Sequence, residues 1–337
     1  MMNWIARLFG VRPQRAVAPA TLPSPPPPAT HGAADEAALA HLDLDLDLDA
    51  RFYCWLAGST RSDAAPATEA LVLAELARLA QTPRLAAELV PRVPAVIPEL
   101  LRSLRDDSVS GADIARLVAQ DVVLVGEVIR EANSSWYRPP APVRTIDGAL
   151  VLLGRNGLRM LLARVAFRPL ISMQPGRFAK QVAPRVWRQS EKCALAASTL
   201  APTTGADPFE AFLAGLVQNV GLVVAFRVID QVCQDAALPA SDAFVGALFD
   251  HARRMGHGIA LHWEFPETVA GAILEGGAAD ATPLAEVLAT GDRLAKLRLL
   301  VDSGAIAPDD PAVAAFVGTR LRPCYDRLAD QPGTEDA

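Results

Sequence analysis

Residues 207–221 read DPFEAFLAGLVQNVG, and this stretch decides the fold class. Asp207 is a favourable N-cap residue and Pro208 suits the first position of a helix, so a helix is expected to begin here. Apolar side chains then recur at the spacing that places them on one helical face. They are Phe209, Phe212, Leu213, Leu216, Val217 and Val220. The stretch is therefore predicted to be a helix with one face in a core.

Helical signals separated by short breaks extend outward from this stretch in both directions. Ser110 and Asp113 resemble a capping box, and Gly154 is expected to end a helix. The expected helices cover 68–79, segments that begin near 98, 110 and 121, then 145–153, 185–200, 241–262, 266–275, 283–302 and 310–328. Apolar residues make up 51% of the chain and aromatic residues 6%, a mixture rich in Ala, Leu and Val that favours helix. Since no βαβ pattern occurs, the chain is predicted to be all-α.

The N-terminal part is expected to differ from the rest. Residues 1–34 combine a short amphipathic helix with a disordered Pro-rich tether, and residues 35–91 are expected to form a helical N-terminal extension. Two interpretations of the start stay open: residues 1–12 make weak contact with a membrane or partner, or they are a disordered tail. The stretch 35–49 carries six acids and no lysine or arginine.

Composition and charge indicate which kinds of partner the protein can bind and in which cellular compartment it works. A net charge of −6 argues against nucleic acid binding over the whole surface. No apolar run reaches the roughly 20 residues of a membrane span, and the N-terminus lacks a signal-peptide cleavage site. The cysteines are far apart and lack metal-ligand spacing, as expected of reduced thiols in a cytoplasmic protein. They are Cys54, Cys193, Cys233 and Cys324.

Several short motifs follow one another in a fixed order from residue 92 onward. They are RVPAVIPELL at 92–101, Gln120-Asp121, Ala132-Asn133-Ser134, ALVLLG at 149–154, Gly157-Leu158-Arg159, and, more thinly, segments at 186–190, 211–221 and 263–266. Together they resemble HDOD domains, the HD-related output domains of bacterial signalling proteins. The resemblance implies a bundle of two packed helical halves: a conserved HDOD half at 92–175 and a degenerate HD-like half at 176–330.

The chain departs from this resemblance at the positions that would hold a metal ion. In HD hydrolases, histidines and aspartates on several helices bind a divalent metal, which generates a hydroxide nucleophile. The position that resembles the first histidine is Gln189, and the His-Asp pair is Gln218-Asn219. Gly276-Gly277 stands where relatives often carry two histidines. Because neutral amides are poor metal ligands, the resemblance predicts a vestigial site, no cofactor and no catalysis.

Residues 155–192 hold nine basic residues and one acid, Glu191, in a chain that is acidic overall. This stretch predicts a site for an anion or an acidic partner. The alternative is a solvated or internally paired surface, because the arginines flank a buried apolar face. We also hypothesise that the acidic segment 35–49 lies near it. The candidate anion- or partner-binding residues are Arg155, Arg159, Arg185 and Arg188.

A second candidate partner surface is the turn that holds Asn133, Ser134 and Trp136, where polar and aromatic residues lie together. The alternative interpretation is a helix C-cap, because Asn tolerates a left-handed turn.

The resemblance and the substituted ligands together predict a non-catalytic signalling or scaffold protein that binds another protein in a bacterial regulatory pathway. Two alternatives stay open: a residual metal-dependent nucleotide phosphohydrolase, and a nucleotide or nucleic-acid sensor that uses residues 155–192. Nucleic acid is the less favoured partner, because aromatic platforms for base stacking are scarce near the basic residues. The sequence leaves the partner, the signal, the pathway and the oligomeric state open.

Overall fold

The computed structural model describes residues 48–58, 66–90, 109–119, 122–134, 137, 139–172, 174–233, 238–278 and 280–329. All regular secondary structure in these segments is helical, which confirms the all-α prediction. The amphipathic helix and disordered tether expected at 1–34, and the helix expected from Pro98, lie outside the described residues.

The helices follow most of the expected boundaries. After a helical segment at 48–57 they are α3 (Pro66–Ala80), α4 (Pro83–Glu88), α6 (Gly111–Val118), α7 (Val122–Ala132), α8 (Ile146–Ser172), α9 (Phe178–Leu200), the 3-10 turn η1 (Ala201–Thr203), α10 (Pro208–Val217), α11 (Val220–Val232), α12 (Asp242–His262), α13 (Glu267–Glu275), α14 (Pro283–Asp302) and α15 (Pro311–Arg327). Local signals explain several starts. Ser110 and Asp113 form the reciprocal capping box, and Asp207 accepts a bond from the backbone N–H of Glu210.

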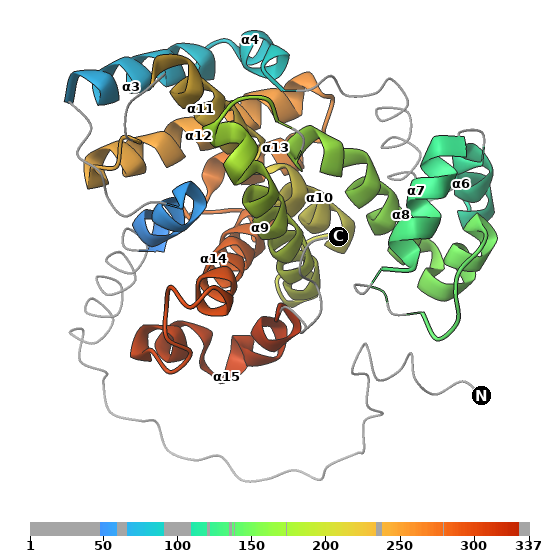
Figure 1. The fold of residues 1–337 in the computed structure, drawn as a ribbon. Coiled ribbons are helices and arrows are strands. Elements are labelled where there is room, and N and C mark those ends of the chain that lie inside the picture. Colours follow the sequence, from blue (N-terminus) through green and yellow to red (C-terminus); the bar gives the residue numbers. More distant parts are fainter. Residues whose placement is uncertain are drawn as a thin grey trace, which may run out of the picture. The chain divides into compact units, whose positions relative to one another are not determined.

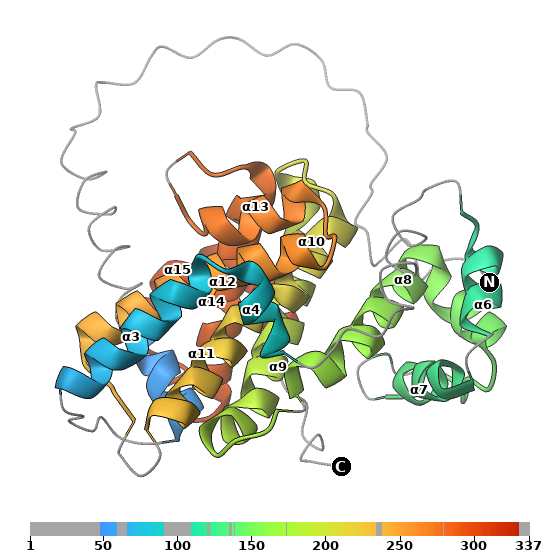
Figure 2. The same ribbon diagram turned by 90° about the horizontal axis from the view of Figure 1, so that it is seen from above.

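Helix α9 is the element around which much of the described chain packs. Helices α8, α10, α11 and α14 all contact it, and Figures 1 and 2 both show α14 alongside it. Helices α11 and α12 also cross closely, since a Cβ at Gly221 would lie 1.9 Å from the carbonyl oxygen of Ala252. Side chains from α8, α10, α11 and α14 therefore lie close to α9.

Helix α8 contains a break at Gly154, where φ is 69° and ψ is 179°. Glycine adopts this left-handed φ at little cost, and the prediction that a helix stops there is confirmed. Helices α6 and α7 pack against α8, as Figure 2 shows, and α8 also contacts α9 and α10. The described residues group as one compact unit, and the proposed division of the chain near residue 175 stays a prediction.

Helix α9 begins at Phe178, so the expected start at residue 185 is wrong. Pro184 lies inside the helix. The carboxylate of Asp230 caps this end by accepting hydrogen bonds from the backbone N–H groups of Phe178, at 2.7 Å, and Ala179, at 2.9 Å. A carboxylate stabilises the otherwise unpaired N–H groups of a helix start, and here it comes from a segment far along the chain.

The apolar stripe at 209–220 is interrupted, because α10 ends at Val217 and α11 begins at Val220. Gln218 and Asn219 form the turn between the two helices. The combined stretch Pro208–Val232 is long and apolar enough to cross a membrane, but 83% of its most apolar window is buried in the bundle. Such apolarity is also what a core helix requires.

The helical segment 48–57 is an integral part of the bundle. Phe52, Tyr53 and Leu56 are at most 1% exposed. The guanidinium of Arg185 on α9 donates a 2.8 Å hydrogen bond to the carbonyl oxygen of Leu56. Apolar burial and a polar contact therefore both fix this segment next to α9.

Candidate functional site

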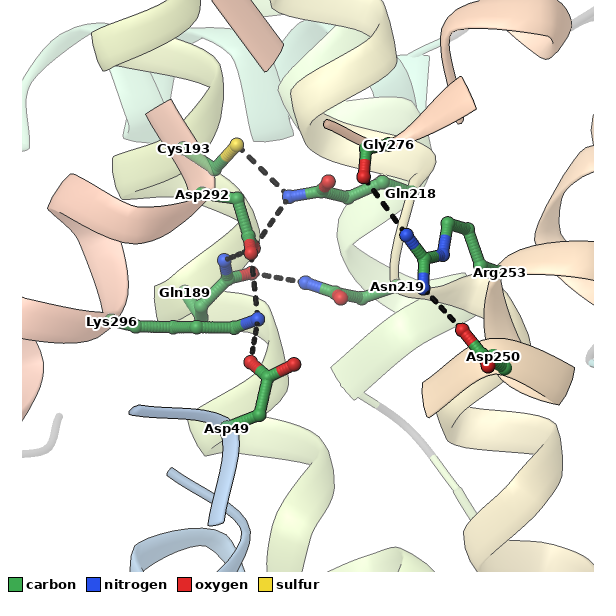
Figure 3. A network of polar contacts seen from close by, with 10 residues as sticks. All are labelled: Asp49, Gln189, Cys193, Gln218, Asn219, Asp250, Arg253, Gly276, Asp292 and Lys296. Atoms are coloured by element: carbon green, nitrogen blue, oxygen red, sulfur yellow. Dashed lines mark hydrogen bonds and ion pairs between the residues drawn. The ribbon is translucent and has the colours of Figure 1, made fainter. Parts of the chain in front are cut away.

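The three amide side chains that stand at the expected metal-ligand positions lie together. Gln189 is completely buried on α9, and Gln218 and Asn219 form the turn between α10 and α11. Nδ2 of Asn219 donates to Oε1 of Gln189 and, at 3.2 Å, to the hydroxyl of Ser190. Figure 3 shows the side chains of Gln189, Gln218 and Asn219 converging. The positions that the resemblance singles out therefore occupy one place in the bundle.

A carboxylate joins these amides. Oδ1 of Asp292, on α14, accepts hydrogen bonds from Nε2 of Gln189 and, at 3.2 Å, from Nε2 of Gln218. Nε2 of Gln218 also donates to Sγ of Cys193 at 2.9 Å. Burial raises the pKa of the Cys193 thiol well above its ordinary value, so this sulfur is a neutral acceptor and not a nucleophilic thiolate.

Lys296 supplies the positive charge that contacts the carboxylate of Asp292. Its Nζ lies 2.6 Å from Oδ2 of Asp292, one turn earlier on α14, and 2.7 Å from Oδ1 of Asp49. Asp49 comes from the segment 48–57, 247 residues away in sequence. Burial alone would lower the pKa of Lys296, but the two aspartates outweigh it and raise the pKa above its ordinary value. The ammonium group is therefore charged and lies between two carboxylates, as Figure 3 shows.

A cavity of about 240 Å³ opens beside this cluster. Its polar and glycine lining consists of Asp49, Gln218, Asn219, Arg253, Gly276, Gly277, Asp292, Arg293 and Lys296. Gly276-Gly277, the expected third ligand position, thus lies in the cavity wall at the end of α13. Here the carbonyl oxygen of Gly276 accepts a 2.9 Å bond from Arg253, which also pairs with Asp250.

The donors around this cavity do not fit a catalytic metal ion. A hydrolytic metal requires imidazole or carboxylate ligands and an open coordination position. Three of the expected ligand positions are amides that bond to neighbouring side chains, and the two carboxylates hold Lys296. Within the segments that the structure describes, no three His, Cys, Asp or Glu side chains form a metal-binding group. A metal-dependent step has no support in this donor set.

Several arginines of the segment 155–192 contact other parts of the chain. The guanidinium of Arg164 pairs with the buried carboxylates of Glu131 and Glu191, from α7 and α9. Arg159 is 6% exposed, and its guanidinium lies 4.2 Å from the ring centroid of Phe209. These contacts match the interpretation of an internally paired segment.

The other three candidate arginines differ in exposure. Arg185 bonds to carbonyl oxygens of the segment 48–57, Arg155 is partly exposed and Arg188 is exposed. Arg155 lies on α8, whereas the other two lie on α9. The role of the four candidates in binding an anion or partner stays a prediction.

The side chain of Asn133 fixes the turn after α7. Its Nδ2 donates to the carbonyl oxygens of Ile129, at 2.8 Å, and Val143, at 2.7 Å, and its Oδ1 accepts a bond from the N–H of Val143 at 2.8 Å. The hydroxyl of Ser134 donates to Glu131 at 3.2 Å. Trp136 lies outside the described residues, and a partner-binding role for this turn stays a prediction.

Sequence reasoning did not single out four residues of the site: Asp49, Arg253, Asp292 and Lys296. A signal existed for the two on α14, because they are four residues apart and in phase with the buried Leu288 and Leu299. Most of the acidic segment 35–49 lies outside the described residues. Its last residue, Asp49, pairs with a lysine outside the segment 155–192.

Comparison with known proteins identifies the family. The profile of the HDOD domain matches residues 90–277, more than half of the chain, and the chain therefore belongs to the HDOD domain family. An uncharacterized protein from Treponema pallidum (strain Nichols) is 30% identical over 153 residues, which is 43% of this chain. The match spans only 29% of that relative's length.

Solved structures share the fold at low sequence identity. An HDOD domain protein of unknown function from Geobacter sulfurreducens superposes with a TM-score of 0.54 and 21% identity, over 78% of this chain and 91% of that one. A candidate phosphohydrolase from Shewanella amazonensis SB2B gives 0.54 and 23%, over 75% and 93% of the two chains. A candidate signal transduction protein from Marinobacter aquaeolei VT8 gives 0.52 and 17%, over 77% and 63%.

Proposed function

We propose that the chain is a non-catalytic signalling or scaffold protein that binds another protein in a bacterial regulatory pathway. The chemistry of the vestigial site carries this proposal. Gln189, Gln218 and Asn219 stand at the ligand positions, and Lys296 binds the carboxylates that a metal would need. Such a site lacks the means to generate a hydroxide nucleophile.

Two comparisons support a signalling role: the chain belongs to the HDOD domain family, and the similar structure from Marinobacter is named as a candidate signal transduction protein. A cytoplasmic location is part of the proposal, and the burial of α10 and α11 inside the bundle is consistent with it. Contact of residues 1–12 with a membrane is a further proposal that concerns residues outside the described segments.

The second candidate function is residual phosphohydrolysis, which the name of the Shewanella structure favours. Purified protein should be incubated with cyclic and linear nucleotides and with Mg²⁺ or Mn²⁺. We expect no turnover above that of an Asp292→Asn variant, because the donor set cannot hold a catalytic metal. Metal-dependent turnover that Asp292→Asn abolishes would contradict the non-catalytic proposal.

Protein binding can be tested by site-specific photo-crosslinking in the native host. Crosslinkers belong at Arg188, which is exposed on α9, and at Val151, which is 87% exposed on α8. The exposed Glu286 on α14 is a matched control position. We expect one discrete protein to crosslink at Arg188 or Val151 and not at Glu286. Equal, non-specific labelling at all three positions would contradict a defined partner surface on α8 or α9.

A further inference from the structure

The carboxylates of Asp49 and Asp292 already surround a single cation. The oxygen-to-nitrogen distances at Lys296 are 2.7 Å and 2.6 Å. Oxygen ligands bind Ca²⁺ at roughly 2.3–2.6 Å, so two carboxylate oxygens converge on a point at nearly the distance that a hard cation requires. The group at that point is the ammonium of Lys296, as Figure 3 shows.

The substituted ligand positions help to orient this arrangement. Nε2 of Gln189 and Nε2 of Gln218 both donate to Oδ1 of Asp292, and Lys296 contacts the other oxygen, Oδ2. The two amides therefore occupy one oxygen of the carboxylate and leave the second for the ammonium. A histidine or an aspartate at either position could coordinate a metal ion. The N–H groups of the two glutamines instead donate hydrogen bonds to the carboxylate of Asp292.

The surroundings favour a permanent cation. The side chain of Lys296 is 8% exposed, and its Nζ lies 5.0 Å from the ring centroid of Phe249 and 5.5 Å from that of Phe52. Aromatic rings at such distances stabilise a buried positive charge. Burial without counter-ions would remove the proton from a lysine, and the two carboxylates prevent this.

We propose that the ammonium group of Lys296 takes the place of a divalent metal ion in this site, and that it keeps hard cations away from the carboxylates of Asp49 and Asp292. A metal ion would have to enter next to a positive charge that is covalently attached to α14 and cannot diffuse away. The inference rests on the proposed absence of catalysis. Its test measures metal binding and not turnover or partner binding, so the two proposals can fail separately.

The test is titration of purified full-length protein with Ca²⁺ and Mn²⁺ by calorimetry. The wild type should bind neither ion at the site, whereas Lys296→Met should bind one equivalent at least about tenfold more tightly, because the carboxylates of Asp49 and Asp292 then face the cavity without the ammonium group. The double variant Lys296→Met/Asp292→Asn should lose this binding. Lys180→Met, which neutralises an exposed lysine on α9, is the matched control and should behave as the wild type.

Two outcomes would overturn the proposal. One is stoichiometric binding by the wild type that Asp292→Asn abolishes; the other is a folded Lys296→Met variant that binds no better than the wild type. Should Lys296→Met fail to fold, nuclear magnetic resonance of the ¹⁵N-lysine-labelled wild type gives the answer, because the chain has only three lysines. The ammonium signal of Lys296 should resist broadening by Mn²⁺. Selective broadening relative to Lys192, which is also buried, would overturn the proposal.

Discussion

Two clusters among the described residues place a buried cation between two carboxylates, and they differ in how far those carboxylates are exposed. In the arginine cluster, Arg164 of α8 pairs with Glu131 and Glu191, whose side chains are 6% and 11% exposed. In the lysine cluster, Lys296 pairs with Asp292 and Asp49, whose side chains border the cavity and are 21% and 36% exposed. The first cluster is enclosed, and the second is open to the cavity.

The choice of cation fits each setting. A planar guanidinium presents several donors in a fixed fork, and Arg164 uses it to join α7, α8 and α9. An ammonium is a compact point charge, and Lys296 uses it at the position where a small ion would otherwise be held. The arginine cluster therefore serves the packing of helices, whereas we propose that the lysine cluster determines which cation the cavity holds.

The largest expected effect is that of Arg164→Met. It leaves the buried carboxylate of Glu191 without its cation and leaves Glu131 with only the half-exposed Arg168, and we expect the free energy of unfolding to fall by about 3–5 kcal/mol. Urea denaturation followed by circular dichroism measures this loss. Arg168→Met is the matched control, because Arg168 is 45% exposed and 3.6 Å from Glu131, and it should cost less than about 1 kcal/mol. Equal losses in the two variants would show that the burial of Arg164 does not make its ion pairs more important for stability than that of Arg168.

Lys296→Met should have the next largest effect, a loss of about 2–3 kcal/mol in the free energy of unfolding. The loss is smaller than that for Arg164 because water in the cavity can solvate Asp49 and Asp292. The same denaturation experiment measures it, with Lys180→Met as the control that should change stability by less than about 0.5 kcal/mol. A loss as small as that of the control would mean that the ammonium is not a required counter-ion.

Asp49→Asn should have a smaller effect, a loss of about 1 kcal/mol or less, because Asp49 is partly exposed and Lys296 keeps Asp292. The consequence should be local. Hydrogen exchange followed by mass spectrometry should show faster exchange in residues 48–57 and unchanged exchange in α9. Unchanged exchange in 48–57 would indicate that its apolar contacts alone hold the segment.

The smallest expected effect is a pH dependence of the arginine cluster. Burial raises the pKa of Glu191 above its ordinary value, although the charge of Arg164 opposes the shift. The folded state then binds the proton more tightly than the unfolded state, so this group adds stability as the pH falls through its raised pKa toward the ordinary carboxyl value. The free energy of unfolding should be measured by denaturation of the wild type and of Glu191→Gln between neutral pH and about pH 5. As the pH falls, the wild type should gain stability relative to the variant. A shift in the opposite direction would indicate a lowered pKa.

Local patterns were sufficient for much of the fold. The starts at Asp207 and Ser110 and the break at Gly154 depend on residues within a few positions, and all three are confirmed. The start of α9 could not be predicted because its cap, Asp230, lies 52 residues from Phe178. In the site, the resemblance located the three amides, but the contact of Asp49 with Lys296 spans 247 residues and depends on tertiary packing alone.

The most direct test of the central claim is a crystal structure of the wild-type protein grown with Mn²⁺, with anomalous data collected at a wavelength where manganese scatters strongly. The account predicts electron density for the ammonium of Lys296 between Asp49 and Asp292 and no anomalous peak there. An anomalous peak within coordination distance of Asp292, with the lysine side chain displaced, would contradict it.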